Sequence, residues 1–515
     1  MTEDLQIDWS IFGGSVALVL ALVIPLALYP EQGRVLLGEA FELLTHNLGI
    51  LYIATGVGAL AFLLYLAFGR FGGIVFSRGE DTGPQFSTIS WSAMLFCGGI
   101  GTSVLYWGTV EWAHYFLTPP LSLQPQSDAA LPWALAYPIF HWGFIGWAFY
   151  CLPGVAMGYA YYIKGASTLR LSLACESVIP PVARPVLNPL IDLIFVVGLV
   201  GACSTGIGLA VPLIGTLSTH LLGVSHQELG FGLDVLVIVI ITLLFSASAW
   251  LGLDRGIKRL SNINIGLAFL LILVVLLLGP TLFILELGVG TLGHLLQNFI
   301  FMSTWTDPQG NGNFVESWTV FYWAWWLALG PFMGVFIAKI SRGRTMRQMI
   351  LGCLGYGTLG CTMFFVVLGN YAAFLELNGV VDVLHIMQSQ SPPDAVVAVL
   401  ATLPGSGFLI FVFAVVCVIF AATSYDSASY TIATAVTYQI GENQHPGRWH
   451  RVFWACFLGL LPITLIYMGG LRPLQSAVTL ASVPLLVVFV LMSWVLWRDL
   501  HVRDQVPETS PITSK

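Results

Sequence analysis

Four aromatic residues at helical spacing form the clearest candidate binding surface. Trp318, Tyr322, Trp325 and Trp326 follow i, i+4, i+7, i+8 spacing in the apolar segment 318–340, so they share one helical face. Tryptophan usually gathers at the membrane–water boundary, but Trp325 and Trp326 lie about 11 Å inside this segment at a rise of ~1.5 Å per residue. Indole faces at that depth suit an organic cation that has no N–H to donate, such as a quaternary ammonium. The alternative interpretation is that these rings fill space between helices.

A second candidate is the glycine-rich stretch formed by Gly98, Gly99 and Gly101. Each glycine weakens a helix by nearly ~1 kcal/mol relative to alanine. At membrane depth an opened backbone is tolerated beside a cavity or within protein. Transporters use such breaks to present helix N-termini to an anionic substrate group and carbonyls to an ion. The alternative is close helix packing through small residues.

Oxygen-bearing side chains gather in another apolar segment, where Thr423 and Ser424 precede Asp426. Adjacent hydroxyls and carbonyls provide a hard-ligand set suited to an alkali cation, although hydroxyls inside helices also bond back to the preceding turn. Asp426 is a functional candidate because a carboxylate near the membrane core is costly, but a bracing role is favoured. His141 is interpreted as a structural hydrogen-bonding residue rather than a proton relay.

Composition places these residues in a membrane protein. The 515 residues are 57% hydrophobic and 9% charged, with a mean hydropathy of +0.85, whereas soluble domains carry about 25% charged residues. The net charge of −7 gives no indication of nucleic-acid binding. The eight cysteines show no metal-site spacing, and the acidic N-terminus is no signal peptide. The loops contain no GxSxG, metal-spaced histidines or paired acidic motif, so no enzyme and no cofactor are expected.

Twelve apolar stretches are long enough to span a bilayer. Since each must satisfy its backbone internally, the expected fold class is an all-α polytopic membrane protein. The predicted spans are 10–29, 48–68, 88–108, 134–163, 187–216, 233–251, 263–287, 317–340, 347–375, 405–438, 450–470 and 474–497.

The basic residues predict the topology. With the N-terminus inside, only Arg34 and Arg472 fall in external loops, so a multi-pass protein of the cell (inner) membrane with both termini cytoplasmic is expected. The segment 291–303 is expected to lie as an amphipathic helix at the outer surface, and 498–515 as a short cytoplasmic tail. The predicted cytoplasmic loops hold Arg70, Arg78, Lys164, Arg170, Arg184, Arg255, Lys258, Arg259, Lys339, Arg342, Arg344, Arg347, Arg448 and Arg451.

Together these segments resemble the betaine/carnitine/choline transporter family from about residue 48 to 497. The most specific part is WTVFYWAWW at 318–326, followed by ISRGR at 340–344. Supporting matches are MLFCGGIGTSVLYWGTVE (94–111), FHWGFIGWAFY (140–150), STGIGLA (204–210) and TSYDSAS (423–429).

The resemblance implies a twelve-helix bundle with two inverted five-helix repeats. Residues 88–290 would hold helices 3–7 and residues 317–497 helices 8–12, with two peripheral helices in 1–87. Members of this family are commonly homotrimers, so a homotrimer in the lipid bilayer is expected.

The resemblance also carries over site residues. The family's aromatic cage matches Trp142, Trp147, Tyr150, Trp325 and Trp326, and Leu329 stands where a third aromatic of that segment is found. Backbone around Gly99 and Gly101 would meet a substrate carboxylate.

The implied sodium positions divide into two sites. The first takes Cys97, Ile100, Thr423 and Ser424. The second matches Thr205 and Phe332, but Gly201 stands where a companion threonine is expected.

The function expected from this resemblance is sodium-coupled symport of an onium compound such as glycine betaine, choline or carnitine. The alternative is sodium-independent exchange, for which the family places an arginine where this chain has Asn264. An ion channel is a more distant alternative. Because the long basic tail of osmosensing members is not found, osmotic gating is not expected.

Overall fold

The computed structural model describes residues 7–78, 83–99, 101–224, 226–251, 254–308, 312–438 and 445–505. Within these ranges the chain is almost entirely helical, and extended pairing is limited to the isolated bridges Ile7–Thr437 and Val75–Thr345. The predicted all-α class is therefore confirmed.

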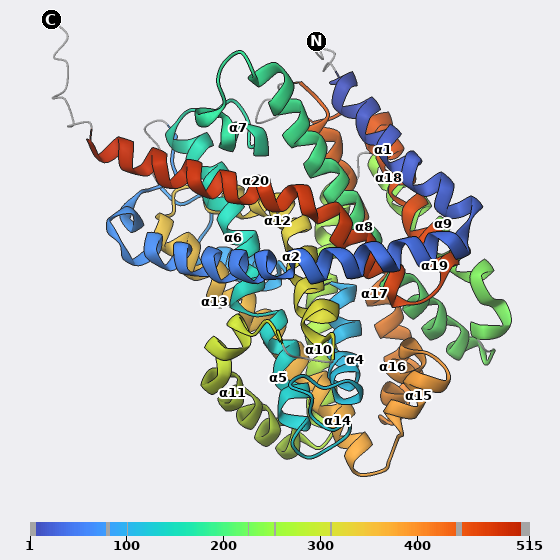
Figure 1. Cartoon of the computed structure of the whole chain (residues 1–515). Helices are drawn as coiled ribbons and strands as arrows, with labels where there is room; N and C mark the ends of the chain where they lie inside the picture. The colour runs from blue at the N-terminus through green and yellow to red at the C-terminus, as the bar shows by residue number, and fades with distance from the viewer. Residues whose placement is uncertain are drawn as a thin grey trace, which may run out of the picture.

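The helices follow the predicted spans closely, although several spans are built from two pieces (Figure 1). The first ten are α1 Trp9–Leu28, α2 Pro30–Phe68, α3 Thr88–Cys97, α4 Thr102–Leu117, α5 Leu131–His141, α6 Phe144–Gly158, α7 Leu171–Cys175, α8 Arg184–Leu222, α9 His226–Leu251 and α10 Asp254–Leu278. The others are α11 Thr281–Thr304, α12 Phe321–Ile340, α13 Met346–Phe364, α14 Asn370–Leu377, α15 Val383–Ser389, α16 Pro392–Ala401, α17 Ser406–Ala435, α18 Arg448–Leu458, α19 Leu460–Met468 and α20 Leu471–Gln505.

Eleven helices of the described ranges are long and apolar enough to cross a membrane, and up to twelve if the bent pair α3–α4 forms one span. The set differs from the prediction in two respects: it includes α11, and it does not include α9, which covers the predicted span 233–251. The eleven include α11, whereas 291–303 was expected to lie at the surface as a shorter helix. Residues 281–290 extend this helix at its N-terminal end, which raises its apolar length.

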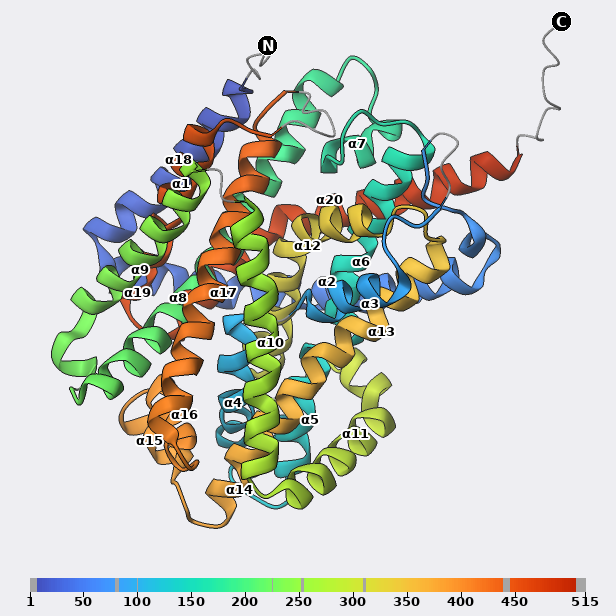
Figure 2. The ribbon, with the colours of Figure 1, turned by 180° about the vertical axis from the view of Figure 1, so that it is seen from behind.

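Helices α6 and α12 pack along each other through small residues in the middle of the bundle. A Cβ at Gly330 would lie 2.7 Å from Phe149 O, and one at Gly334 would lie 2.8 Å from Gly154 N. Glycines let two backbones approach this closely. Helices α2 and α20 cross side by side on one face (Figure 1), and α10 and α17 stand together on the opposite face (Figure 2).

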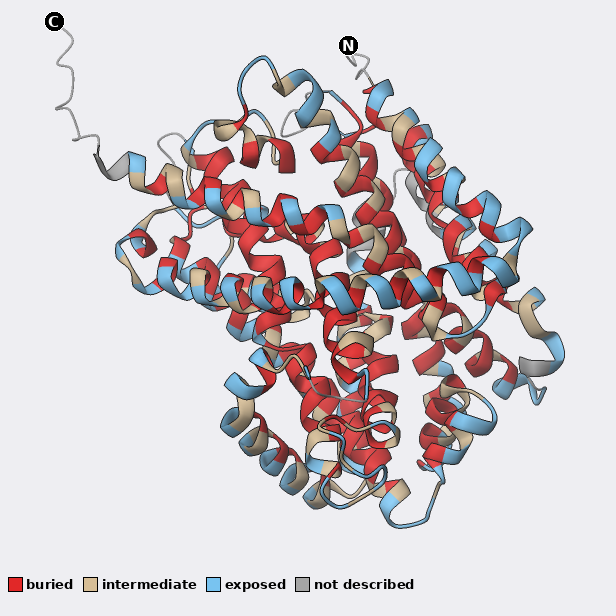
Figure 3. Ribbon diagram, viewed as in Figure 1, coloured by how far each residue is buried: buried red, intermediate tan, exposed pale blue. Residues whose placement is uncertain are grey.

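Burial separates this inner core from the outer helices. The inner helices are mostly buried, whereas α1, α2, α11 and α20 alternate between buried and exposed residues (Figure 3). An apolar exposed face is what a bilayer would cover.

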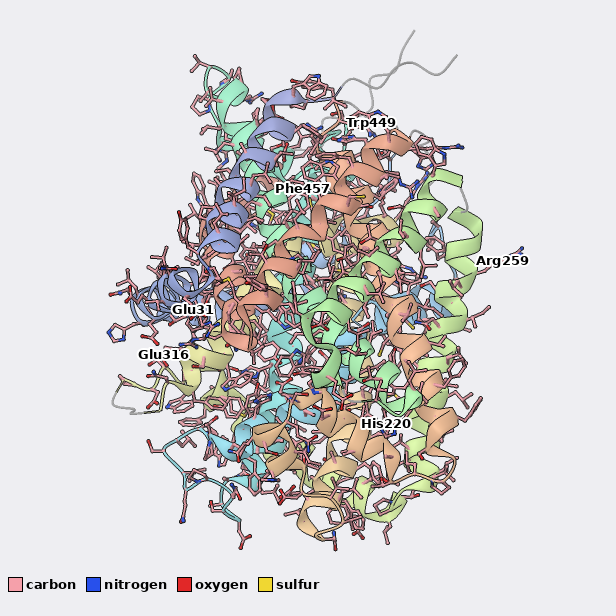
Figure 4. All side chains as sticks on the ribbon, turned by 90° about the vertical axis from the view of Figure 1, so that its right-hand side faces the viewer. Glu31, His220, Arg259, Glu316, Trp449 and Phe457 are labelled. Atoms are coloured by element: carbon pink, nitrogen blue, oxygen red, sulfur yellow. The ribbon has the colours of Figure 1, made fainter. Side chains whose placement is uncertain are left out.

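Both ends of the described chain attach to the same region. Asp8 N donates to Val436 O (2.9 Å) after α17, and Ser177 Oγ donates to Asp499 Oδ1 (3.0 Å) on α20. Figure 4 shows Trp449 near one end of the bundle and His220 toward the other.

The bent span is held by helix α13. A Cβ at Gly360 would lie 2.2 Å from Phe96 O on α3, so this crossing has no room for a methyl group. By contrast, a Cβ at Gly355 on the same helix would meet nothing within 4 Å.

We therefore expect Gly360→Ala to destabilise the protein by about 1–3 kcal/mol, because an added methyl must push α3 away. The measurement is the thermal unfolding midpoint in detergent. The control is Gly355→Ala, which should keep or raise the midpoint because alanine favours helix. Equal midpoints for the two variants would contradict the observed crossing.

Candidate functional site

Five aromatic side chains from two regions of the chain meet in one buried cluster. Trp142 lies between α5 and α6, Trp147 and Tyr150 lie on α6, and Trp325 and Trp326 lie on α12. The ring of Trp142 stands 5.7 Å from that of Trp325 at 90° and 5.6 Å from that of Trp326 at 75°. Trp326 also lies 4.4 Å from Tyr150 and 5.8 Å from Trp147. All five are at most 7% exposed, so the structure gathers every predicted cage aromatic in one place.

The indole N–H groups fix how some of these rings are oriented. Trp325 Nε1 donates to Ala202 O on α8 (3.2 Å), and Trp142 Nε1 donates to Glu111 Oε2 on α4 (3.1 Å). A buried indole N–H normally finds such an acceptor. These bonds link the aromatic cluster to α4 and α8.

The predicted helix break is present next to this cluster. Helix α3 ends at Cys97, α4 begins at Thr102, and the two are bent by 56°. Gly101 is extended at φ −157° as the N-cap of α4. A Cβ at Gly99 would lie 2.7 Å from the Trp147 ring, whereas one at Gly101 would meet nothing within 4 Å. The break therefore has one packed side and one open side.

The first turn of α4 lies close to Trp325. A Cβ on Gly206 of α8 would lie 3.9 Å from Ser103 Oγ and 4.0 Å from Trp325 Cζ2. Thr102 Oγ1 donates across to Cys417 O on α17 (3.0 Å). Because the free N–H groups of a helix start carry partial positive charge, this turn can receive an anionic group.

The residues predicted for the first sodium site differ in their exposure and hydrogen bonding. Thr423 Oγ1 donates back to Ile419 O (2.9 Å), Ser424 is exposed, and Cys97 is half-buried. Ile100 lies outside the described residues. The threonine oxygen retains lone pairs that could face a cation.

Asp426 forms an ion pair with Arg451 on α18, with Oδ1 and Nη2 3.0 Å apart. This contact supports the bracing interpretation of that carboxylate.

At the second predicted sodium position, the hydrogen of the Thr205 hydroxyl lies between two backbone carbonyls. Thr205 is fully buried, and its hydroxyl contacts Gly201 O (3.2 Å) and Leu474 O (3.0 Å). Phe332 and Leu329 are partly buried on α12. Asn264, at the position of the family's arginine, donates to Val416 O on α17 (3.1 Å).

A buried polar chain adjoining the cage was not among the predicted site residues. Glu111 Oε1 accepts from Tyr115 Oη (2.6 Å), and that hydroxyl is 2.9 Å from His141 Nδ1. His141 Nε2 in turn lies 3.0 Å from Thr319 Oγ1. The predicted span 88–108 stops before Glu111, whereas α4 continues to Leu117. A longer span would have identified Glu111 as an acidic residue inside an apolar helix. His141 makes hydrogen bonds through both ring nitrogens, as the structural interpretation requires.

A cavity of about 380 Å³ opens near the end of the bundle that bears α7. It reaches along α12 from Arg342 to Pro331, which lies between one and two turns from the tryptophan pair. Its lining also includes Arg170, Asp192 and Lys339. This cavity thus approaches the aromatic cluster from the end of the bundle that bears α7.

Comparison with known proteins identifies the family of this chain. The chain is 35% identical over 436 residues to the uncharacterized transporter YeaV of Escherichia coli (strain K12), covering 84% of this chain and 89% of that protein. It is 32% identical over 437 residues to a carnitine transporter of Acinetobacter baumannii, covering 85% and 78%. The profile of the betaine/carnitine/choline family transporters matches residues 10–505. The chain is therefore a multi-pass membrane transporter and belongs to the betaine/carnitine/choline transporter family.

Proposed function

We propose that this protein is a secondary active transporter that takes up a quaternary-ammonium compound by alternating access. The observation that carries the proposal is the meeting of five buried aromatic rings with a broken span. Rings of this kind bind a methylated cation through their π-faces, each contributing about 0.5–2 kcal/mol. Carnitine, glycine betaine and choline all carry such a group, and one relative is named a carnitine transporter.

The proposed substrate lies with its two ends in different environments. Its ammonium group faces Trp142, Trp325 and Trp326, while a carboxylate faces the first turn of α4 beside Ser103. That turn lies next to Trp325, and helix starts stabilise anions. The pairing favours a zwitterion such as carnitine or betaine, whereas choline would use the aromatic end alone.

The rings touch one another in this conformation, at centroid distances of 4.4–5.8 Å. Binding therefore requires them to part. The cavity lined by Pro331 and Lys339 supplies a route toward one side of the membrane. Rocking of one helix group against the other would open the opposite side.

We infer that sodium drives this uptake from the external side of the inner membrane, with a cation at Thr423 and Ser424 that links α17 to the broken span. Each sodium moving inward supplies about 2.3 kcal/mol per 100 mV. Sodium-independent exchange is the second candidate. The retained hydroxyl pair and the neutral Asn264 favour sodium coupling, and assembly as a homotrimer is expected from the family.

We expect Trp325→Ala to reduce uptake of labelled carnitine or betaine into vesicles at least tenfold, because the cation loses a π-face. The control is Trp449→Ala, since Trp449 is 50% exposed whereas Trp325 is 6% exposed. Normal uptake by the Trp325 variant would place the substrate elsewhere.

We expect Thr423→Ala to raise the sodium concentration needed for half-maximal uptake severalfold, because an oxygen ligand is lost. The control is Thr464→Ala, which removes a hydroxyl that likewise bonds back to its own helix, at Leu460 O (3.0 Å). If wild-type uptake does not depend on the sodium concentration and instead requires unlabelled substrate inside the vesicles, the exchange mechanism replaces symport.

A further inference from the structure

We propose that Glu111 supplies the negative charge that makes the aromatic site prefer cations over neutral molecules of the same shape. The inference rests on the proposed function and assigns a specificity-determining residue to that site. Its basis is the contact between this carboxylate and Trp142, the ring that stands edge-on to both Trp325 and Trp326.

The carboxylate is fully buried and close to the cage. Glu111 is 0% exposed, and its Oε2 lies 3.1 Å from Trp142 Nε1. One indole ring therefore separates the carboxylate from the surface that the substrate's ammonium would face. At such short range a buried charge acts strongly on another charge, because little water screens it.

The hydrogen-bond chain can hold Glu111 as an anion. Thr319 can donate to His141 Nε2, His141 Nδ1–H to Tyr115 Oη, and Tyr115 to Glu111 Oε1, at 3.0, 2.9 and 2.6 Å. In this arrangement His141 is neutral and each group donates once. The carboxylate then accepts two donors, those of Tyr115 and Trp142, which stabilise its charged form.

These donors leave the negative charge without a permanent cation. Among the described residues, the basic group within ion-pair distance of Glu111 is His141, whose Nδ1 lies 3.6 Å away. A buried charge that lacks a full counter-charge is costly. A substrate cation would reduce that cost, and a neutral substrate would not.

The same contact also changes the ring itself. An N–H that donates to a carboxylate becomes polarised, so electron density on the Trp142 ring rises and its face attracts cations more strongly. Both effects depend on charge. A purely structural role would need only an oxygen acceptor for the indole N–H.

Glu111→Gln separates these roles, because glutamine keeps an oxygen acceptor and has the shape of the protonated acid. The measurement is calorimetric binding of choline and of 3,3-dimethylbutanol, its neutral carbon isostere, to the purified full-length protein with sodium. We expect choline to bind about tenfold more weakly to the variant and the alcohol to bind within about twofold of wild type. If the variant still binds both ligands, equal weakening of both, or no change in either, overturns the inference.

The control is Glu376→Gln, which neutralises a half-buried carboxylate that accepts from Leu384 N (3.2 Å) and should change neither affinity. If the glutamine variant binds neither ligand, Glu111→Asp decides. If Glu111→Asp again binds choline more tightly than the alcohol, the role of the negative charge is supported. If it also binds neither ligand, the inference is overturned. Wild type that binds carnitine while Glu111→Gln leaves the ratio of the two affinities unchanged would overturn only this inference. Wild type that binds no onium compound would overturn the proposed function as well.

Discussion

The site depends on indole rings that pack directly onto glycines of neighbouring helices. A Cβ at Gly357 would lie 2.3 Å from the Trp147 ring, and one at Gly146 would lie 2.6 Å from the Trp326 ring. No other residue leaves room for these rings at such crossings, because protein interiors are close-packed. Gly99 has two roles as a consequence. It weakens the helix where the span breaks, and it makes space for Trp147 beside the break.

Side-chain hydrogen bonds then join the region of the broken span to α17. Thr102 of α4 donates to Cys417 O, and Asn264 of α10 donates to Val416 O. Two consecutive carbonyls in the middle of α17 thus receive side chains from two other helices. If α17 moved, it would either break both hydrogen bonds or move together with Thr102 and Asn264. This point therefore connects the broken span to the helix that bears Thr423.

Sequence periodicity predicted the all-α class and most helix positions, and it placed Trp325 and Trp326 on one helical face. The set of five cage aromatics came from the family resemblance. The aromatic residues could be found because their spacing in 318–326 is local and their depth follows from the helical rise. The surroundings of Glu111 could not be predicted from the sequence. Its hydrogen-bond network includes His141 and Thr319, which contact each other although they lie 178 positions apart. The bond from Thr423 Oγ1 to Ile419 O in its own preceding turn is the alternative that the sequence already offered for this hydroxyl. The prediction for α11 was wrong because the predicted span 263–287 crossed the break between Leu278 and Thr281 and assigned the first residues of α11 to the preceding helix.

The charges around this cavity affect how fast a substrate passes through it. Its lining includes three basic residues, Arg170, Lys339 and Arg342, and the acidic residue Asp192. A molecule with net positive charge therefore meets an unfavourable potential there, while a zwitterion does not. Fixed charges of this kind alter the speeds of passage in both directions by the same barrier. They therefore cannot change the concentration ratio that is finally reached.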